Sequence, residues 1–171
     1  MFVGFSLNAQ NRKGVTTEFN GKYKKSISSK KGILSGEAFT KMKSSLSKEL
    51  QINLENNKAV VIHYFQYGKN CLLAGYNDED VLNILNNMYR IANSAENRLN
   101  IKNYYVYNSN SFFESILVNQ ESFVLDSGFF KETLFTEDKN CEAFYVLKDN
   151  GEFLICYGED NYDDINSFLS N

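Results

Sequence analysis

The stretch "FYVLKDNGEFLICY", residues 144–157, decides the fold class expected for this chain. Two apolar runs flank Asn150-Gly151, a dipeptide that tolerates the two positive φ angles of a type I′ turn. The stretch therefore predicts an antiparallel hairpin. The same dipeptide within "VTTEFNGKYKKSI" (residues 15–27) predicts a second hairpin. A third is expected in "AVVIHYFQYGKNCLLAGY" (residues 59–76), with its turn at residues 67–70.

Helical patterns separate these hairpins. In "SGEAFTKMKSSLSKELQINLENN", which begins at Ser35, apolar side chains recur every three or four positions, and Ser35 is a suitable N-cap. The pattern is stronger in "NDEDVLNILNNMYRIANSAENRL", where Asn77 can cap a helix with an acidic first turn. Shorter helices are expected from Ser111 and within "NYDDINSFLS" (residues 161–170). Hairpins alternating with helices predict an α+β fold with a mostly antiparallel sheet and two main amphipathic helices.

The size and composition of the chain predict a single domain over residues 1–171. A chain of 171 residues is long enough to bury a core. Aromatic residues, all Phe or Tyr, make up 15% of it, which argues for a packed core and against wholesale disorder. Whether residues 8–32 form an ordered hairpin or a mobile arm is left open.

The cysteines and the lack of long apolar runs predict a cytoplasmic protein. No run of 18 apolar residues is present, and the patch at residues 2–5 is too short for a signal-peptide core. Cys71, Cys141 and Cys156 are odd in number and far apart, unlike a disulfide framework. We therefore expect all three cysteines to be reduced, and we expect no membrane association.

The sequence carries no recognisable catalytic or cofactor motif. It lacks a glycine-rich phosphate loop, paired Cys and His ligands, and a GxSxG turn. The only histidine, His63, lies in a strand that is apolar on both faces, which predicts a buried side chain with one hydrogen bond. A nucleophilic pair of His63 with Cys71 is the catalytic alternative. We expect no catalytic residue, no metal and no cofactor.

The carboxylates in "YGEDNYDD", residues 157–164, admit three interpretations. Paired carboxylates act in glycosidases and in some metal-dependent nucleases. Acidic residues also stabilise the N-terminus of a helix through its dipole and through capping. The third interpretation is a surface that binds another molecule.

Charge is divided unevenly along the chain. Residues 1–58 hold 11 Lys and Arg against 4 Asp and Glu, a net charge of +7. Residues 59–125 have a net charge of −2, and residues 126–171 have 3 against 11, a net charge of −8. Either the two ends fold against each other and cancel, or one of them meets a partner of opposite charge.

These features favour a non-enzymatic protein that binds a basic protein partner. The class that fits is a bacterial immunity protein or antitoxin that occludes a toxin's active site with an acidic, tyrosine-rich surface. We expect that surface to comprise nine residues: Glu137, Asp138, Glu142, Tyr157, Glu159, Asp160, Tyr162, Asp163 and Asp164.

Three other functions stay open. One is a secretion-type chaperone, and another is a small enzyme that uses carboxylates or His63. The third is a nucleic-acid-binding accessory protein that works through the basic segment at residues 11–32. The isoelectric point near 5.3 argues against nucleic acid as the partner.

Overall fold

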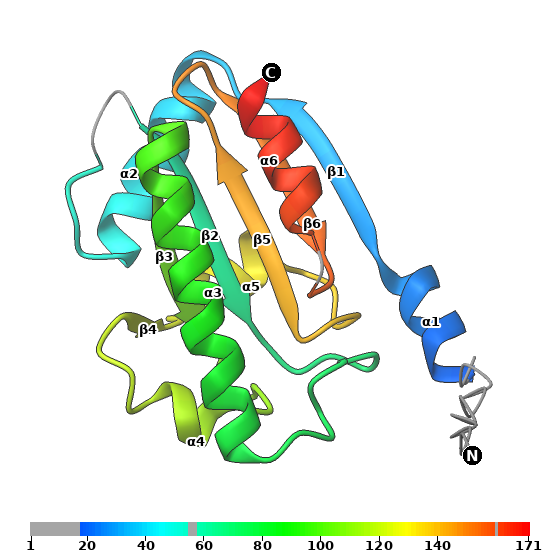
Figure 1. Ribbon diagram of the computed structural model, residues 1–171. Coiled ribbons are helices and arrows are strands. Elements are labelled where there is room, and N and C mark those ends of the chain that lie inside the picture. Colours follow the sequence, from blue (N-terminus) through cyan, green and yellow to red (C-terminus); the bar gives the residue numbers. More distant parts are fainter. Residues whose placement is uncertain (1–17, 55–57, 160) are drawn as a thin grey trace, which may run out of the picture.

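A six-stranded mixed sheet forms the centre of the computed structural model, which describes residues 18–54, 58–159 and 161–171 (Figure 1). The pairs β1–β6, β6–β5 and β5–β2 are antiparallel, whereas β2–β3 and β3–β4 are parallel. The α+β class and the mostly antiparallel sheet are therefore confirmed. In spatial order the strands are β1 (Ser28–Ile33), β6 (Glu152–Tyr157), β5 (Glu142–Leu147), β2 (Ala59–Phe65), β3 (Ile101–Tyr107) and β4 (Phe123–Leu125).

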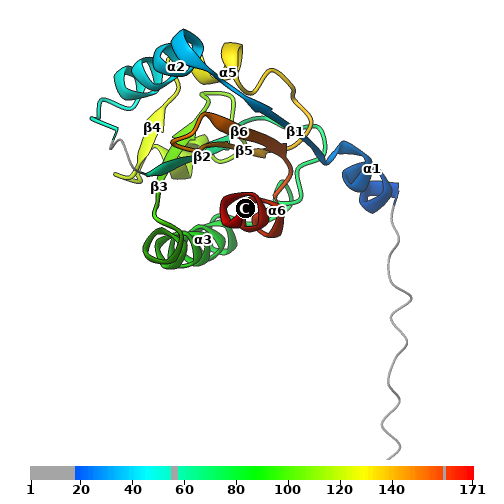
Figure 2. The same cartoon turned by 90° about the horizontal axis from the view of Figure 1, so that it is seen from above.

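Helices cover both faces of the sheet. α3 (Asp78–Leu99) and α6 (Tyr162–Ser170) lie on one face, and α2 (Gly36–Glu49) and α5 (Phe129–Thr133) lie on the other (Figure 2). α1 (Glu18–Ser26) precedes the edge strand β1, and the short α4 (Glu114–Leu117) follows β3. The two main helices and the short C-terminal helix lie where the apolar periodicity predicts them. Within the described part of the chain, no helix combines the length and apolarity that crossing a membrane requires.

The central strand β2 is buried on both faces, as its sequence predicts. Its alternate residues Val60, Ile62 and Tyr64 belong to the core cluster beneath α2 and α5. Val61 and Phe65 belong to the clusters beneath α3 and α6, on the same face as His63. The side chains of β2 therefore contribute to the core beneath both helical layers, since successive side chains of a strand point to opposite faces.

The hairpin at Asn150-Gly151 is confirmed, although its turn differs from the expected type I′. Lys148 N donates a hydrogen bond to Glu152 O at 2.8 Å, so the turn has three residues. Gly151 has a φ of +87°, and Asn150 does not share its positive φ. Such a turn places the glycine alone in the left-handed region.

The hairpin predicted at Asn20-Gly21 is wrong, because this dipeptide lies inside α1. The strand that follows, β1, pairs with β6 rather than with a neighbouring segment. A tertiary contact accompanies this arrangement: the hydroxyl of the buried Tyr23 accepts a hydrogen bond from Glu159 N at 3.1 Å. Of the segment considered as a possible arm, residues 18–32 belong to α1 and β1 or join them, and residues 8–17 lie outside the described residues.

The hairpin predicted within residues 59–76 is also wrong. β2 pairs with β3 and β5, and residues 66–77 form a loop that leads into α3. This loop finds its partners in the segment before β5: Gln66 N donates to Cys141 O, and Asn70 N donates to Lys139 O. A parallel neighbour such as β3 needs a crossover connection, which α3 supplies.

Candidate functional site

Two of the nine residues expected on an acidic surface are buried instead. Glu142 is 5% exposed at the start of β5, and Tyr157 is 6% exposed at the end of β6. Both strands are internal to the sheet and are covered by helices. The Tyr157 hydroxyl donates to Leu134 O at 3.4 Å and accepts from Glu137 N at 3.3 Å. Neither side chain contributes to an outer surface, so this part of the expectation is wrong.

The other predicted residues divide into three groups. Glu137 forms an ion pair with Lys139, and the exposed Asp138 forms one with Lys131. Glu159 and Tyr162 are partly buried at the edge of a cavity described below, and Asp160 lies outside the described residues. Only Asp163 and Asp164 are exposed without an ion pair to a described lysine or arginine.

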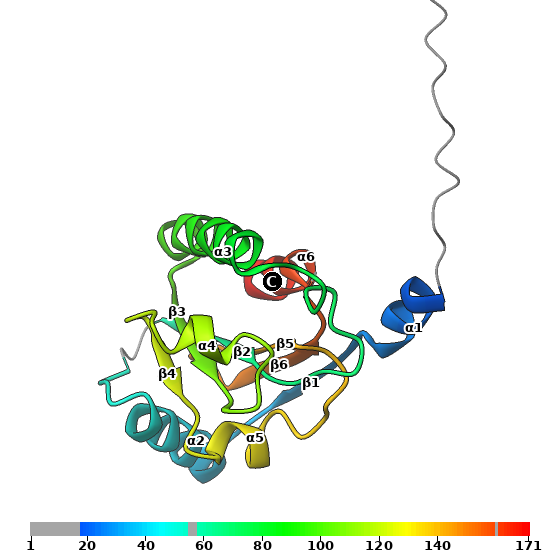
Figure 3. The same cartoon turned by 90° about the horizontal axis from the view of Figure 1, so that it is seen from below.

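A second acidic group lies in the first turn of α3, at the same end of the sheet as Asp163 and Asp164. α3 and α6 lie on one face and run in the same direction, so their N-termini point toward the same end of the sheet (Figures 1 and 3). The first turn of α3 is exposed, and none of its carboxylates pairs with a described lysine or arginine. The five carboxylates of the two first turns, which we call the acidic end, are Asp78, Glu79, Asp80, Asp163 and Asp164.

A cavity of about 330 Å³ lies between the N-terminal half of α3 and the loop before it. Most of its wall is apolar and comprises Phe65, Leu72, Leu73, Val81, Ile84, Leu85, Met88, Ile91 and Phe113. Its polar lining is Asn87, Glu142, Glu159 and Tyr162, without a lysine, arginine or histidine among the described residues. The cavity is thus apolar with two acidic groups.

The pairing of β5 with β6 brings these two glutamates together. The register places Ala143 opposite Tyr157, and Gly158 N donates to Glu142 O at 3.0 Å. Gly158 has a φ of +129°, which turns the chain after β6 so that Glu159 lies beside Cys141. The two carboxyl groups therefore come from the ends of adjacent strands.

Glu142 faces His63 inside the core. Its Oε1 lies 3.8 Å from His63 Nδ1, and neither atom has a hydrogen bond within the described structure. Burial raises the pKa of the Glu142 carboxyl, and the neighbouring His63 imidazole opposes that rise. Glu142 is thus a buried acid with one free acceptor atom.

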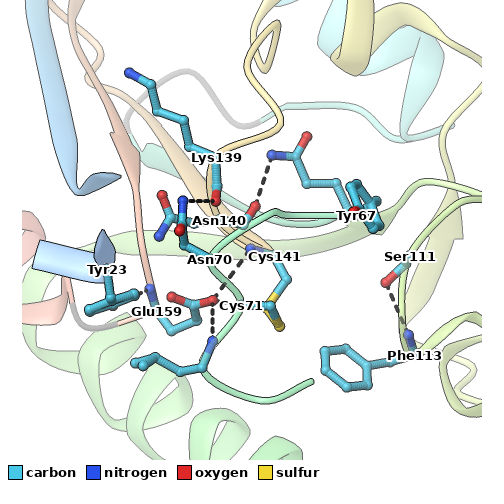
Figure 4. The surroundings of a disulfide bond; sticks show 12 residues. Tyr23, Tyr67, Asn70, Cys71, Ser111, Phe113, Lys139, Asn140, Cys141 and Glu159 are labelled. Carbon is cyan, nitrogen blue, oxygen red and sulfur yellow. Dashed lines mark hydrogen bonds between the residues drawn. A yellow bond between two sulfur atoms is a disulfide. The ribbon is translucent and has the colours of Figure 1, made fainter. Parts of the chain in front are cut away.

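Glu159 lies against a disulfide bond between Cys71 and Cys141 (Figure 4). Its Oε1 accepts hydrogen bonds from Leu72 N and Cys141 N, both at 3.3 Å, and lies 2.8 Å from Cys141 Sγ. Its Oε2 is buried without a hydrogen-bond partner in the described structure. Burial raises the pKa of this carboxyl, the hydrogen bonds to it oppose that rise, and the charge of Glu142 adds to it.

The disulfide corrects the expectation that all three cysteines are reduced. Cys71 and Cys141 are 70 residues apart in sequence, and the loop after β2 meets the segment before β5 at this point. The cytoplasmic location inferred from reduced cysteines loses that support. Cys156 is free and buried, and burial raises the pKa of its thiol to about 12.

The arrangement of His63 matches the expected buried strand residue. Its Nε2 donates to Asn103 Oδ1 at 3.0 Å, and its ring packs against Tyr105 and Phe144. It is 2% exposed. Cys71, the nucleophile considered for it, is bonded to Cys141 and has no thiolate to offer.

One group of residues meets the spacing of a metal site. Among the described residues, Cys71, Cys141 and Glu159 are the group whose ligand atoms lie within 4.8 Å of one another. Thiolates rather than disulfide sulfurs bind metals, so in the disulfide form this group offers a single carboxylate. The donor set therefore does not fit a metal ion in this form.

Sequence reasoning did not identify the apolar wall of the cavity. The stripe on α3 identifies Val81, Leu85 and Met88 as inward-facing, yet it does not show that part of this face borders an open space. Leu72 and Leu73 were assigned to a strand that does not form. The pairing of Cys71 with Cys141 leaves no local signal, since the two lie far apart in the chain.

Comparison with protein-family models, curated proteins and solved structures returns no match for this chain. No activity is carried over from another protein. The charges, the cavity and the contacts of this chain therefore carry the functional argument.

Proposed function

We propose that this protein is a non-enzymatic binding protein that neutralises a basic protein partner, as an immunity protein or antitoxin neutralises its toxin. The acidic end supports the proposal. Its five carboxylates are exposed and form no ion pair with a described lysine or arginine, so their negative charge is free to attract a basic partner. Carboxylates placed where a toxin expects an anionic substrate would occlude its active site.

The distribution of lysines favours one orientation of such a partner. The basic residues of the N-terminal elements lie on α1, on the edge strand β1 and on α2, which covers the face opposite α3 and α6 (Figure 2). α1 lies beside the start of α6, since the Tyr23 hydroxyl accepts a hydrogen bond from Glu159 N, whereas the lysines of α2 lie across the sheet from α3 and α6 (Figure 2). Because the sheet separates the α2 lysines from the acidic end, a basic partner is attracted to the side of α3 and α6, and their encounter is faster.

The competing explanation is that these carboxylates only stabilise their own helices. Negative charge near a helix N-terminus contributes about 0.3–1 kcal/mol to stability without any partner. A test must therefore separate lost binding from lost stability. Asp163→Asn with Asp164→Asn removes two charges from the acidic end, and Glu121→Gln with Glu132→Gln removes two exposed charges elsewhere.

The experiment measures binding to the products of the neighbouring genes, co-expressed and purified. Isothermal titration calorimetry gives the dissociation constant at low and high salt for the wild type and both double variants. We expect the Asp163/Asp164 variant to bind more weakly and with a smaller salt dependence, whereas the Glu121/Glu132 variant behaves as wild type. Equal losses in both variants, or binding indifferent to salt, would rule out the acidic end as the interface.

A further inference from the structure

We propose that the cavity beneath α3 binds a primary alkylammonium group, with the ammonium between Glu142 and Glu159 and the alkyl chain along the apolar wall. This ligand lies within the cavity, and its binding depends on neither the acidic end nor a protein partner.

The two glutamates each leave one acceptor atom unused. Glu142 Oε1 and Glu159 Oε2 are buried and lack a hydrogen bond within the described structure. Glu142 Oε1 faces His63 Nδ1 at 3.8 Å without a hydrogen bond, and Glu159 receives its two backbone donors on Oε1 alone. No lysine, arginine or histidine lines the cavity among the described residues. A cationic ligand supplies both the charge and the missing donors.

The placement of the free acceptors on two different carboxyl groups favours an ammonium over other cations. The free oxygens belong to two carboxyl groups on different strand ends, and an ammonium carries three donors that point in different directions. A guanidinium prefers the two oxygens of one carboxylate, because its donors lie in one plane. A divalent metal needs more ligand atoms, and Glu142 is not part of the group with metal-site spacing among the described residues.

The apolar wall specifies the rest of the ligand. α3 contributes Val81, Ile84, Leu85 and Met88, and the preceding loop contributes two leucines. A volume of about 330 Å³ suits a small ligand, and a mostly apolar pocket with a few convergent polar groups is the usual form of such sites. A linear alkyl chain buries its methylene groups here while its charged head reaches the glutamates.

Cation binding is also coupled to protons. Burial raises the pKa of both carboxyls, so in the empty cavity they hold protons to higher pH than exposed glutamates do. An ammonium between them favours the ionised forms. Its binding therefore releases protons, and the measured enthalpy of binding depends on the ionisation enthalpy of the buffer.

The test uses n-hexylamine as the probe and n-hexanol as its uncharged counterpart. Both are titrated into the full-length, disulfide-bonded protein and followed by calorimetry and by amide chemical shifts in NMR. We expect hexylamine to shift resonances around the cavity and to bind more than about tenfold more tightly than hexanol, because only the amine forms charge-assisted hydrogen bonds with the glutamates. An absence of cavity shifts, or equal affinity for the two probes, would overturn the proposal.

Three variants locate the site. Glu142→Gln and Glu159→Gln should each weaken hexylamine binding by more than about tenfold and leave hexanol unaffected. If either fails to fold, Ile84→Phe serves instead, because it fills the cavity and leaves both carboxyls in place. The Asp163→Asn/Asp164→Asn variant should bind hexylamine as wild type does, so a failure of the acidic end is distinguished from a failure of this site.

A second arm identifies the source of the ammonium group. Nα-acetyl-lysine methylamide presents the same group on a peptide backbone. Binding of this compound as tight as that of hexylamine assigns the site to a lysine side chain of another protein, and binding of hexylamine alone assigns it to a free amine. Both results support an alkylammonium site, whereas retention of hexylamine binding in both glutamate variants refutes it.

Discussion

Removal of the Cys71–Cys141 disulfide should cost about 4 kcal/mol of stability. The two residues are 70 positions apart, and the loop that the bond closes contains α3, β3, α4, β4 and α5. The chain-entropy relation for a loop of this length gives about −15 cal/mol/K, which at room temperature corresponds to about 4 kcal/mol of the free energy of unfolding. Most of this comes from the unfolded state, which the bond keeps compact.

The comparison is between the oxidised wild type and the Cys71→Ala/Cys141→Ala variant in urea unfolding followed by circular dichroism. The variant should unfold at lower urea, and its m-value should be larger, because the unfolded chain without the bond exposes more surface. Adding a reductant should lower the stability of the wild type and leave the variant unchanged. That control separates breakage of the bond from other effects of the reductant.

Alkylation under denaturing, non-reducing conditions tests the bond itself. Mass spectrometry should find one labelled cysteine, Cys156, in the oxidised protein and three after reduction. Three labelled cysteines without reduction would show that the bond is not formed. A loss below about 1 kcal/mol in the double variant, with the bond verified by labelling, would refute the loop-entropy argument.

Three further predictions concern stability. The pKa of Glu142 is raised by burial, so the folded state binds more protons than the unfolded state above pH 4.5, and the free energy of unfolding falls as pH rises. Glu142→Gln should flatten that fall in urea titrations across pH. Asn77→Ala should cost about 1 kcal/mol, because Asn77 Oδ1 caps Asp80 N at 3.0 Å, whereas Ser35→Ala should cost much less, since Ser35 makes no side-chain cap. Gly151→Ala should destabilise by more than about 1 kcal/mol, because at a φ of +87° its Cβ would clash with the backbone oxygen of Leu34. Gly21→Ala inside α1 should stabilise by about 1 kcal/mol in thermal unfolding.

The helices were predictable because their signals are local. Apolar spacing on α3 and the cap at Asn77 depend only on residues within a few turns of one another, and the structure has both. Strand partners depend on residues far apart in the chain. The strand β2 was identified correctly, yet its neighbours β3 and β5 begin about 40 and 80 residues later, and a propensity pattern does not carry that information.

The two Asn-Gly dipeptides show how context decides a turn. Both dipeptides can adopt a positive φ, but neither is obliged to do so, and Asn20-Gly21 lies in a helix. α1 also has a tertiary partner, because the Tyr23 hydroxyl accepts a hydrogen bond from Glu159 N. At Asn150-Gly151 the apolar runs on both sides belong to buried strands, so the hairpin forms. Whether Asn-Gly forms a hairpin turn therefore depends on whether the segments beside it become buried strands, and not on the dipeptide itself.

The candidate cavity depends on the register of this confirmed hairpin. A type I′ turn at Asn150-Gly151 would pair residue 149 with residue 152 and place Asp160 opposite Cys141. The three-residue turn instead pairs Lys148 with Glu152, which places Glu159 opposite Cys141. One residue of register therefore decides which carboxylate reaches the disulfide and the cavity. The sequence identifies an acidic cluster at residues 159–164, but its division into the inward Glu159 and the outward Asp163 and Asp164 follows from the turn and from the bend at Gly158.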